Sequence, residues 1–145
     1  MTVSNENLSL LLLKARENSV SYVRPILAEV GLTEQQWRVI RTLKRDGEMN
    51  AQDLAGESCI LSPSLSRILN RLENEKVILK KVDSKDQRAL NIKLSAKGSR
   101  LHDRVAPKIE KQYKVLTQAV GKDTVSKLIV LLETFSSRGK PNDDG

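Results

Sequence analysis

The stretch CILSPSLSRILNRLE, residues 59–73, decides the fold because it predicts one helix with two very different faces. Ser62 is a good N-cap, and Pro63 suits the first helical position, where its missing amide donor is not needed. Apolar side chains at the spacing i, i+3, i+4 and i+7 form the buried face: Leu65, Ile68, Leu69 and Leu72. The outward face carries small polar or cationic side chains: Ser64, Ser66, Arg67, Asn70 and Arg71.

The residues before this stretch predict three more helices. Apolar spacing indicates a helix over 5–30, with a kink or break near Pro25, which lacks an amide donor. A second helix begins at Thr33, which fits a capping box with Gln36. A short third helix over 51–57 then leads, through a four-residue turn, into the quoted helix.

After the quoted helix the apolar period changes from helical to alternating. Segments 77–82 and 89–94 are β-prone and flank the charged sequence DSKDQR, 83–88. We expect a two-stranded hairpin with a charged tip. Ser95 is then the predicted cap of a long helix, which Pro107 is expected to bend.

This order of elements predicts a mainly α protein with a small β-hairpin, that is, a winged helix-turn-helix with flanking N- and C-terminal helices. We expect a single domain over 1–145. The DNA-binding lobe would span about 33–95, the flanking helices about 5–30 and 96–136, and a disordered tail about 139–145.

Composition and net charge limit the classes of molecule that this protein is expected to bind. The 145 residues carry a net charge of +7, which favours a polyanion, although a basic protein with no such partner is the alternative. Aromatic residues make up only 3%, too few for a single-strand binder that stacks bases. One cysteine suits a reducing compartment, and the apolar run at 8–13 is too short to span a bilayer. Together with the lack of a signal peptide, this indicates a cytoplasmic protein without membrane association.

The outward face of the quoted helix fits the major groove of a DNA duplex. Short side chains let the backbone approach, and Arg and Asn are the favoured partners of guanine and adenine. The hairpin tip would grip phosphates or an adjacent minor groove. The predicted DNA-binding residues are Ser62, Ser64, Ser66, Arg67, Asn70, Arg71, Lys85, Gln87 and Arg88. The alternatives are a solvated helix with a serine-rich cap and, given Asp83 and Asp86, an acidic turn without function.

Three segments carry a family resemblance. LTEQQWRVIRTL (32–43), ILSPSLSRILNRLENEKVI (60–78) and DSKDQRALNIKLSAKG (83–98) resemble the MarR family, the multiple antibiotic resistance regulators. RPILAEVGLTEQQWRVIR (24–41) is similar to the branch that represses catabolism of homoprotocatechuate and related aromatic acids. The tip of the predicted hairpin, which is the wing of this fold, departs from the family pattern. In the family this segment often holds several arginines, whereas here it holds only Arg88.

The terminal helices indicate self-association. LSLLLLKA and VSKLIVLLETF, residues 8–15 and 125–135, carry apolar side chains on more than one face. Exposing apolar surface costs about 25 cal/mol per Å², so a second copy is the expected cover. The resemblance likewise implies a homodimer joined by these helices, reading a pseudo-palindromic operator. A monomer with a well-covered core is the alternative.

The resemblance also implies a small aromatic acid as inducer, bound between the dimer helices and the DNA-binding lobe. Arg16 and Arg38 are candidates for its carboxylate, since the guanidinium offers two parallel donors. Trp37 would stack on the ring, and Ser19 or Tyr22 would bind a phenol. The alternative places Trp37 in the core and Arg16 in an ion pair with Glu17 or Glu34.

The sequence gives no sign of catalysis or of a metal or cofactor site, and it leaves redox control as an alternative. His102 is expected on a solvated helix face, and no histidine, cysteine or glycine-rich motif indicates an enzyme, a metal or another cofactor. Cys59 is expected to pack in the core, with redox control as the alternative. The favoured function is a ligand-released repressor. A nonspecific architectural DNA binder and a protein-interaction module with a winged fold remain as alternatives.

Overall fold

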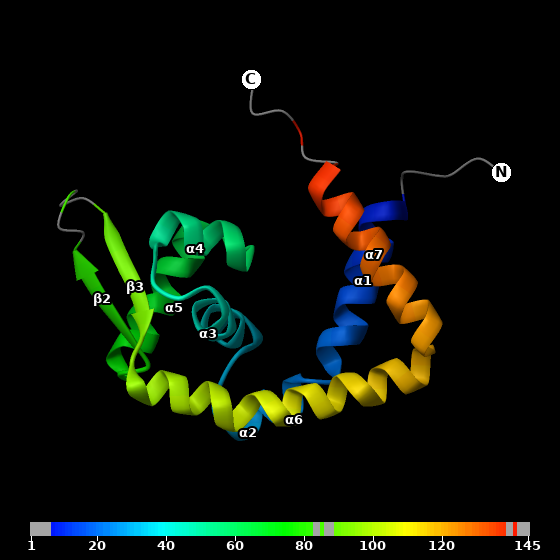
Figure 1. Ribbon diagram of the computed structural model, residues 1–145, viewed down its shortest axis with the longest axis horizontal. Helices are drawn as coiled ribbons and strands as arrows, with labels where there is room; N and C mark the ends of the chain where they lie inside the picture. The colour runs from blue at the N-terminus through cyan, green and yellow to red at the C-terminus, as the bar shows by residue number, and fades with distance from the viewer. Residues whose placement is uncertain (1–6, 83–84, 86–88, 139–140, 142–145) are drawn as a thin grey trace.

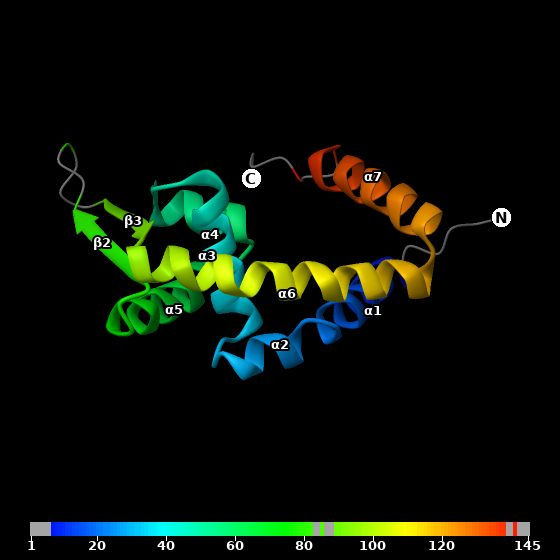
Figure 2. The same cartoon turned by 60° about the horizontal axis from the view of Figure 1, so that its bottom comes forward.

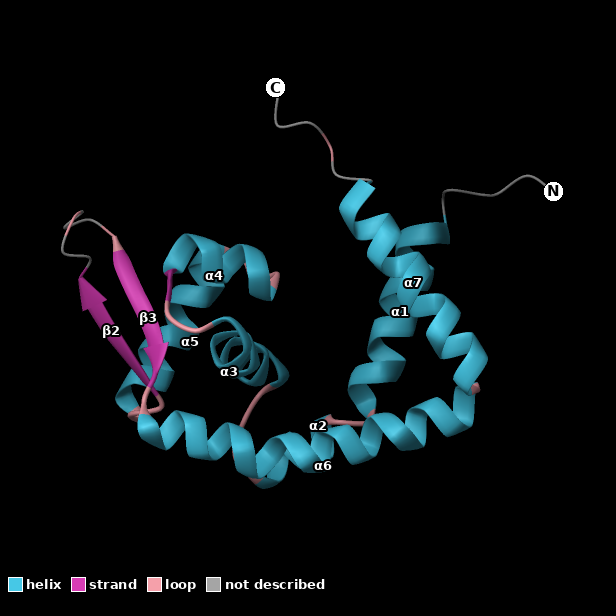
Figure 3. Ribbon diagram, in the orientation of Figure 1, coloured by secondary structure: helices cyan, strands magenta, loops and turns pink. Residues whose placement is uncertain are grey.

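The computed structural model describes residues 7–82, 85, 89–138 and 141. It is mainly helical with one small antiparallel sheet, as predicted (Figures 1 and 3). The elements are α1 Leu8–Ser21, α2 Arg24–Glu29, α3 Glu34–Asp46, β1 Met49–Asn50, α4 Ala51–Ser58, α5 Ser62–Asn74, β2 Ile78–Val82, β3 Leu90–Leu94, α6 Ala96–Val120 and α7 Lys122–Arg138.

Two predicted helix starts are confirmed by their hydrogen bonds. The Thr33 hydroxyl accepts from the Gln36 amide at 3.1 Å, while the Gln36 side chain accepts from the Thr33 amide at 3.0 Å. This is the full capping box at the start of α3. At the start of α6, the Ser95 hydroxyl accepts from the Gly98 amide at 3.0 Å.

The break predicted near Pro25 is confirmed, and it divides the segment 5–30 into two helices, α1 and α2. The break falls before Arg24, and Pro25 occupies the first turn of α2, where no amide donor is required. In contrast, the long helix α6 continues through Pro107 without interruption.

The predicted cap of α5 is wrong. Leu61 has extended backbone angles, and its carbonyl oxygen accepts from the Leu65 amide at 2.9 Å, so Leu61 is the N-cap. Ser62 is therefore the first helical residue, and its hydroxyl makes no capping hydrogen bond. The helix, Ser62–Asn74, still contains all the apolar and polar positions predicted for it.

The predicted hairpin forms and gains a third strand. The sheet order is β1-β3-β2, all antiparallel, with Met49 opposite Ile92 and Ile78 opposite Leu94. Residues 83–84 and 86–88 of the predicted charged tip lie outside the described residues.

The hydrophobic core lies mainly in the lobe built from α3, α4, α5 and the sheet. Leu65, Leu69 and Leu72 of α5 are buried there, and Ile68 packs against the same cluster. Figures 1 and 2 show α6 running as a rod from this lobe to α1 and α7, which stand apart from it. The buried face of α5 therefore fixes which of its sides points outward.

Candidate DNA-binding surface and adjoining pocket

Helices α4 and α5 are joined by a tight turn. Cys59 adopts left-handed backbone angles (φ 54°, ψ 49°) just after α4. Ile60 follows and is buried, with its amide donating to the Ala55 carbonyl at 3.1 Å. The prediction of a core cysteine is wrong, because the left-handed turn directs Ile60 inward and leaves Cys59 exposed.

The outer face of α5 carries the predicted polar residues. Ser64 is half-buried, and the others are exposed: Ser62, Ser66, Arg67, Asn70 and Arg71. Arg71 pairs with Glu75 at 3.0 Å, and the side-chain oxygen Oδ1 of Asn70 accepts from Lys80 Nζ at 2.6 Å. Arg67 makes no ion pair or hydrogen bond with any described residue. A long cation with free donors thus stands among short side chains.

The hairpin adds cations beside α5. Lys81 and Lys93 are exposed on β2 and β3, and Lys85 is exposed between the strands. The predicted contacts Gln87 and Arg88, together with Asp83 and Asp86, lie outside the described residues.

A cavity of about 350 Å³ lies between α3 and α6. Trp37 and Arg41 line it from α3, and His102 and Tyr113 line it from α6. The rings of Trp37 and His102 are stacked, with centroids 5.3 Å apart and planes within 8°. Among the described residues Arg41 has no ion-pair partner. The cavity therefore combines flat rings with the guanidinium of Arg41 and the carboxyl group of Glu110.

His102 is not on a solvated face, which corrects the sequence prediction. Its side chain is 17% exposed because it stacks on Trp37, and its Nδ1 lies 2.9 Å from Asp103 Oδ1. The hydrogen bond with His102 and the bond from Lys44 hold the pKa of the Asp103 carboxyl below its usual value.

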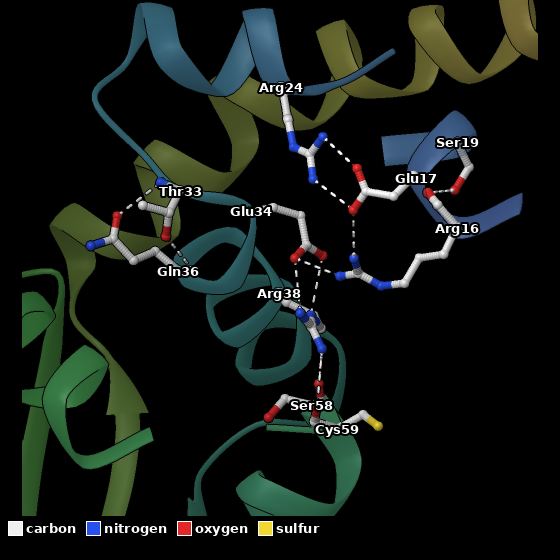
Figure 4. Close-up of polar contacts among 10 residues, drawn as sticks. All are labelled: Arg16, Glu17, Ser19, Arg24, Thr33, Glu34, Gln36, Arg38, Ser58 and Cys59. Carbon is white, nitrogen blue, oxygen red and sulfur yellow. Dashed lines mark hydrogen bonds and ion pairs between the residues drawn. The ribbon is translucent and has the colours of Figure 1, made fainter. Parts of the chain in front are cut away.

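Of the predicted ligand residues, Trp37 alone lines this cavity. The Ser19 hydroxyl donates to the Arg16 carbonyl at 2.8 Å, and Tyr22 is half-buried elsewhere. Arg16 and Arg38 both contact the Glu34 carboxylate (Figure 4). Both parts of the alternative drawn from the sequence are confirmed: Arg16 pairs with Glu34, and Trp37, only 6% exposed, belongs to the hydrophobic core. Sequence reasoning missed the other six lining residues, which include the acidic Glu110: Arg41, His102, Ala106, Ile109, Glu110 and Tyr113.

Comparison with known proteins assigns the family. Residues 32–90 match the MarR family model, a range that begins before α3 and ends as β3 begins. The homoprotocatechuate degradative operon repressor of Escherichia coli is 38% identical over 140 residues, covering 97% of this chain and 95% of that protein. The chain belongs to the MarR family. It is thus a MarR-type transcriptional regulator whose DNA-binding unit is the winged helix described above.

Solved MarR-type structures share this fold. The transcriptional regulator PA4135 is 40% identical with a TM-score of 0.89, covering 92% of this chain and 98% of that one. NadR in complex with 4-hydroxyphenylacetate is 33% identical with a TM-score of 0.80, covering 89% and 94%. Within the described part of this regulator, none of the helices combines the length and the hydrophobicity that a membrane span requires.

Proposed function

We propose that this MarR-family protein is a cytoplasmic homodimer, acting as one domain, that represses genes of aromatic-compound catabolism. It binds a pseudo-palindromic operator and leaves it when a small aromatic carboxylate binds. The outer face of α5 carries this proposal, because it presents Arg67, Asn70 and three serines beside the wing. Such side chains fit base edges and phosphates of the major groove. The relative at 38% identity is a repressor, which supports repression rather than activation.

Exposed apolar surface on the terminal helices supports the homodimer. Within the described part of the chain, α7 has no buried residue, and six of its large apolar side chains are exposed. Leu8, Leu10, Leu11 and Leu13 of α1 are also exposed. Covering a hundred square ångströms of such surface contributes about 2.5 kcal/mol, so a second copy is a strongly favoured partner. Both helices stand away from α5, which leaves α5 available to DNA (Figure 1).

The cavity between α3 and α6 supports an aromatic acid as the ligand. The planar group of Arg41 can donate two parallel hydrogen bonds to a carboxylate, and the Tyr113 hydroxyl can bind a carboxylate or a phenol. The stacked rings of Trp37 and His102 form part of the wall against which the ligand ring would lie. We assign the carboxylate to Arg41 because Arg16 and Arg38 already contact Glu34. NadR, crystallised with 4-hydroxyphenylacetate, supports this ligand class.

Release follows if the ligand binds one dimer geometry better than another. A ligand shifts a conformational equilibrium only by its difference in affinity for the two states. The cavity joins α3 of the DNA-binding lobe to α6, which leads to α7. A ligand that changes the angle between these helices would change the spacing of the two α5 helices across the dimer.

The test uses a duplex selected from random sequences by the wild-type protein and a shuffled duplex of equal composition. At physiological salt, a specific repressor should prefer the selected duplex by at least about a thousandfold. An architectural DNA binder would hold both duplexes equally and lose affinity for both steeply with salt. A protein-interaction module would bind neither duplex.

A further inference from the structure

We infer that Arg38 is a positioning residue for operator binding: it clamps the turn between α4 and α5, and Glu34 joins this clamp to Arg16 on α1. The inference rests on the proposed function, because it explains how α5 is held for DNA. It assigns Arg38 and Glu34 to the orientation of α5, although Arg38 was predicted from the sequence to bind ligand.

The clamp begins at the last carbonyls of α4. Arg38 Nη1 donates to the carbonyl oxygens of Ser58 and Cys59, each at 3.0 Å (Figure 4). Carbonyls at the end of a helix lack partners within that helix, so they require donors from elsewhere. Cys59 also has a left-handed backbone, which is unfavourable for a residue with a side chain. Arg38 therefore supplies from α3 the donors that hold this strained turn.

Glu34 fixes the guanidinium of Arg38. Nε donates to one carboxylate oxygen at 3.1 Å and Nη2 to the other at 2.8 Å, which is the bidentate arrangement of the strongest Arg–carboxylate pairs. The side chains are only 25% and 21% exposed. All three nitrogens of Arg38 are thus used at once, and rotation of its planar group would break at least one contact.

The same carboxylate reaches α1. Arg16 Nη2 lies 2.9 Å from Glu34 Oε2, the oxygen that also accepts from Arg38. One oxygen is therefore shared between α1 and the clamp on the α4–α5 turn. If α1 moves relative to the lobe, Arg16 moves away from or toward Glu34, and this alters the strength of the ion pair between Glu34 and Arg38. This route links an exposed, leucine-rich helix to the position of α5.

Helix α3 connects the clamp with the ligand cavity. Trp37 and Arg41 line the cavity, while Glu34 and Arg38 make the clamp, and all four belong to α3. A displacement of α3 by a ligand would move the donors that hold the turn. In the proposed release from DNA, the contacts between Arg38 and the α4–α5 turn are therefore the ones that ligand binding would change.

The experiment compares two variants that change the clamp in different ways. Arg38→Lys keeps the positive charge but lacks the planar fork, so it cannot hold two carbonyls and a bidentate carboxylate together. Glu34→Gln removes a negative charge, which by electrostatics alone would strengthen binding to DNA. Arg45→Gln is the matched control on α3: it breaks ion pairs with Asp46 and Glu57 but touches no turn carbonyl.

Affinities are measured by fluorescence anisotropy without ligand, for the selected and the shuffled duplex. We expect Arg38→Lys to weaken selected-duplex binding roughly tenfold or more, which corresponds to about 1.4 kcal/mol, while shuffled-duplex binding and its salt dependence stay within about twofold. Glu34→Gln should also weaken selected-duplex binding, against the sign of its charge change. Adding Glu34→Gln to Arg38→Lys should have little further effect, because the two residues act as a unit. Arg45→Gln should retain the wild-type preference.

Three results would overturn the inference. One is a wild-type preference for the selected duplex retained by both variants. Another is tighter binding of Glu34→Gln to the selected duplex, because the loss of a negative charge alone would then explain the effect. If Arg38→Lys does not fold, the result with Glu34→Gln is the test of the inference. The third is an equal loss on both duplexes with a reduced salt slope, which would make Arg38 a phosphate contact. If the wild-type protein itself shows no preference, the proposed function fails first and the inference falls with it.

Discussion

Arg67 is the clearest single candidate for reading a base. It is exposed on the outer face of α5, has no partner among the described residues, and is flanked by Ser66 and Ser64. Replacing it with alanine removes no internal contact, so the folded protein should be unaffected. A lost bidentate contact with a base reduces discrimination by about 1–3 kcal/mol.

We therefore predict that Arg67→Ala weakens binding to the selected duplex about tenfold to a hundredfold, with an unchanged melting temperature. Fluorescence anisotropy and thermal unfolding measure the two quantities. Arg100→Ala, an exposed cation of α6, is the control and should lose less affinity. Equal losses in the two variants would mean that Arg67 contributes only general charge.

Arg41 is the corresponding candidate in the cavity. A ligand at one hundred times its dissociation constant stabilises the folded protein by about 2.7 kcal/mol, which raises the melting temperature. We predict that 4-hydroxyphenylacetate or 3,4-dihydroxyphenylacetate produces such a rise in the wild-type protein and almost none in Arg41→Gln. Arg45→Gln should respond like the wild type. A full response of Arg41→Gln would place the carboxylate elsewhere.

The junction of β2 and α6 depends on one glycine. Gly98 lies in the first turn of α6, and a Cβ there would overlap the carbonyl oxygen of Val77. That carbonyl also accepts from the Ser95 amide at 3.0 Å, so it is not free to move away. We predict that Gly98→Ala lowers the free energy of unfolding by about 1–3 kcal/mol, the usual effect of overpacking.

Gly56 in α4 gives the matched control, since a Cβ there meets nothing within 4 Å. Gly56→Ala should stabilise the protein by about 0.5–1 kcal/mol, because alanine is the better helix former. Urea unfolding at one protein concentration measures both variants. A Gly98→Ala protein as stable as the wild type would show that β2 and α6 can separate without loss.

Local patterns predicted most elements because each depends on nearby residues. The capping box at Thr33, the apolar stripe of α5 and the alternation of β3 all lie within short windows. Strand β1 has two residues, too few to show alternation. The left-handed turn at Cys59 occurs without the glycine that usually marks it, so the exposure of this residue had no local signal.

The cavity could be predicted only in part. Arg41 stands one helical turn after Trp37, so a cation on that side of α3 could have been noticed. His102 and Tyr113 come from α6, more than sixty positions later, and no local spacing relates them to Trp37. The engagement of Arg38 by Glu34 and the turn carbonyls likewise requires α3 and α4 to be packed together.

The molecule as a single chain leaves a large apolar surface on α7 uncovered. Leu131 is 66% exposed there, and a charge at this position would be buried in the proposed dimer. We predict that Leu131→Glu is monomeric at micromolar concentration in sedimentation analysis and binds the selected duplex weakly. Leu79→Glu, the same change at an exposed leucine of β2, should remain dimeric. A dimeric Leu131→Glu protein would remove α7 from the interface.

In the proposed complex two α5 helices, one from each copy, enter successive major grooves on one side of the same duplex. Base-modification interference on the selected duplex tests it directly. If two α5 helices bind in this way, modification of major-groove guanines and adenines should block binding at two clusters, centred about 10 base pairs apart. A single cluster, or interference confined to phosphates and the minor groove, would contradict it.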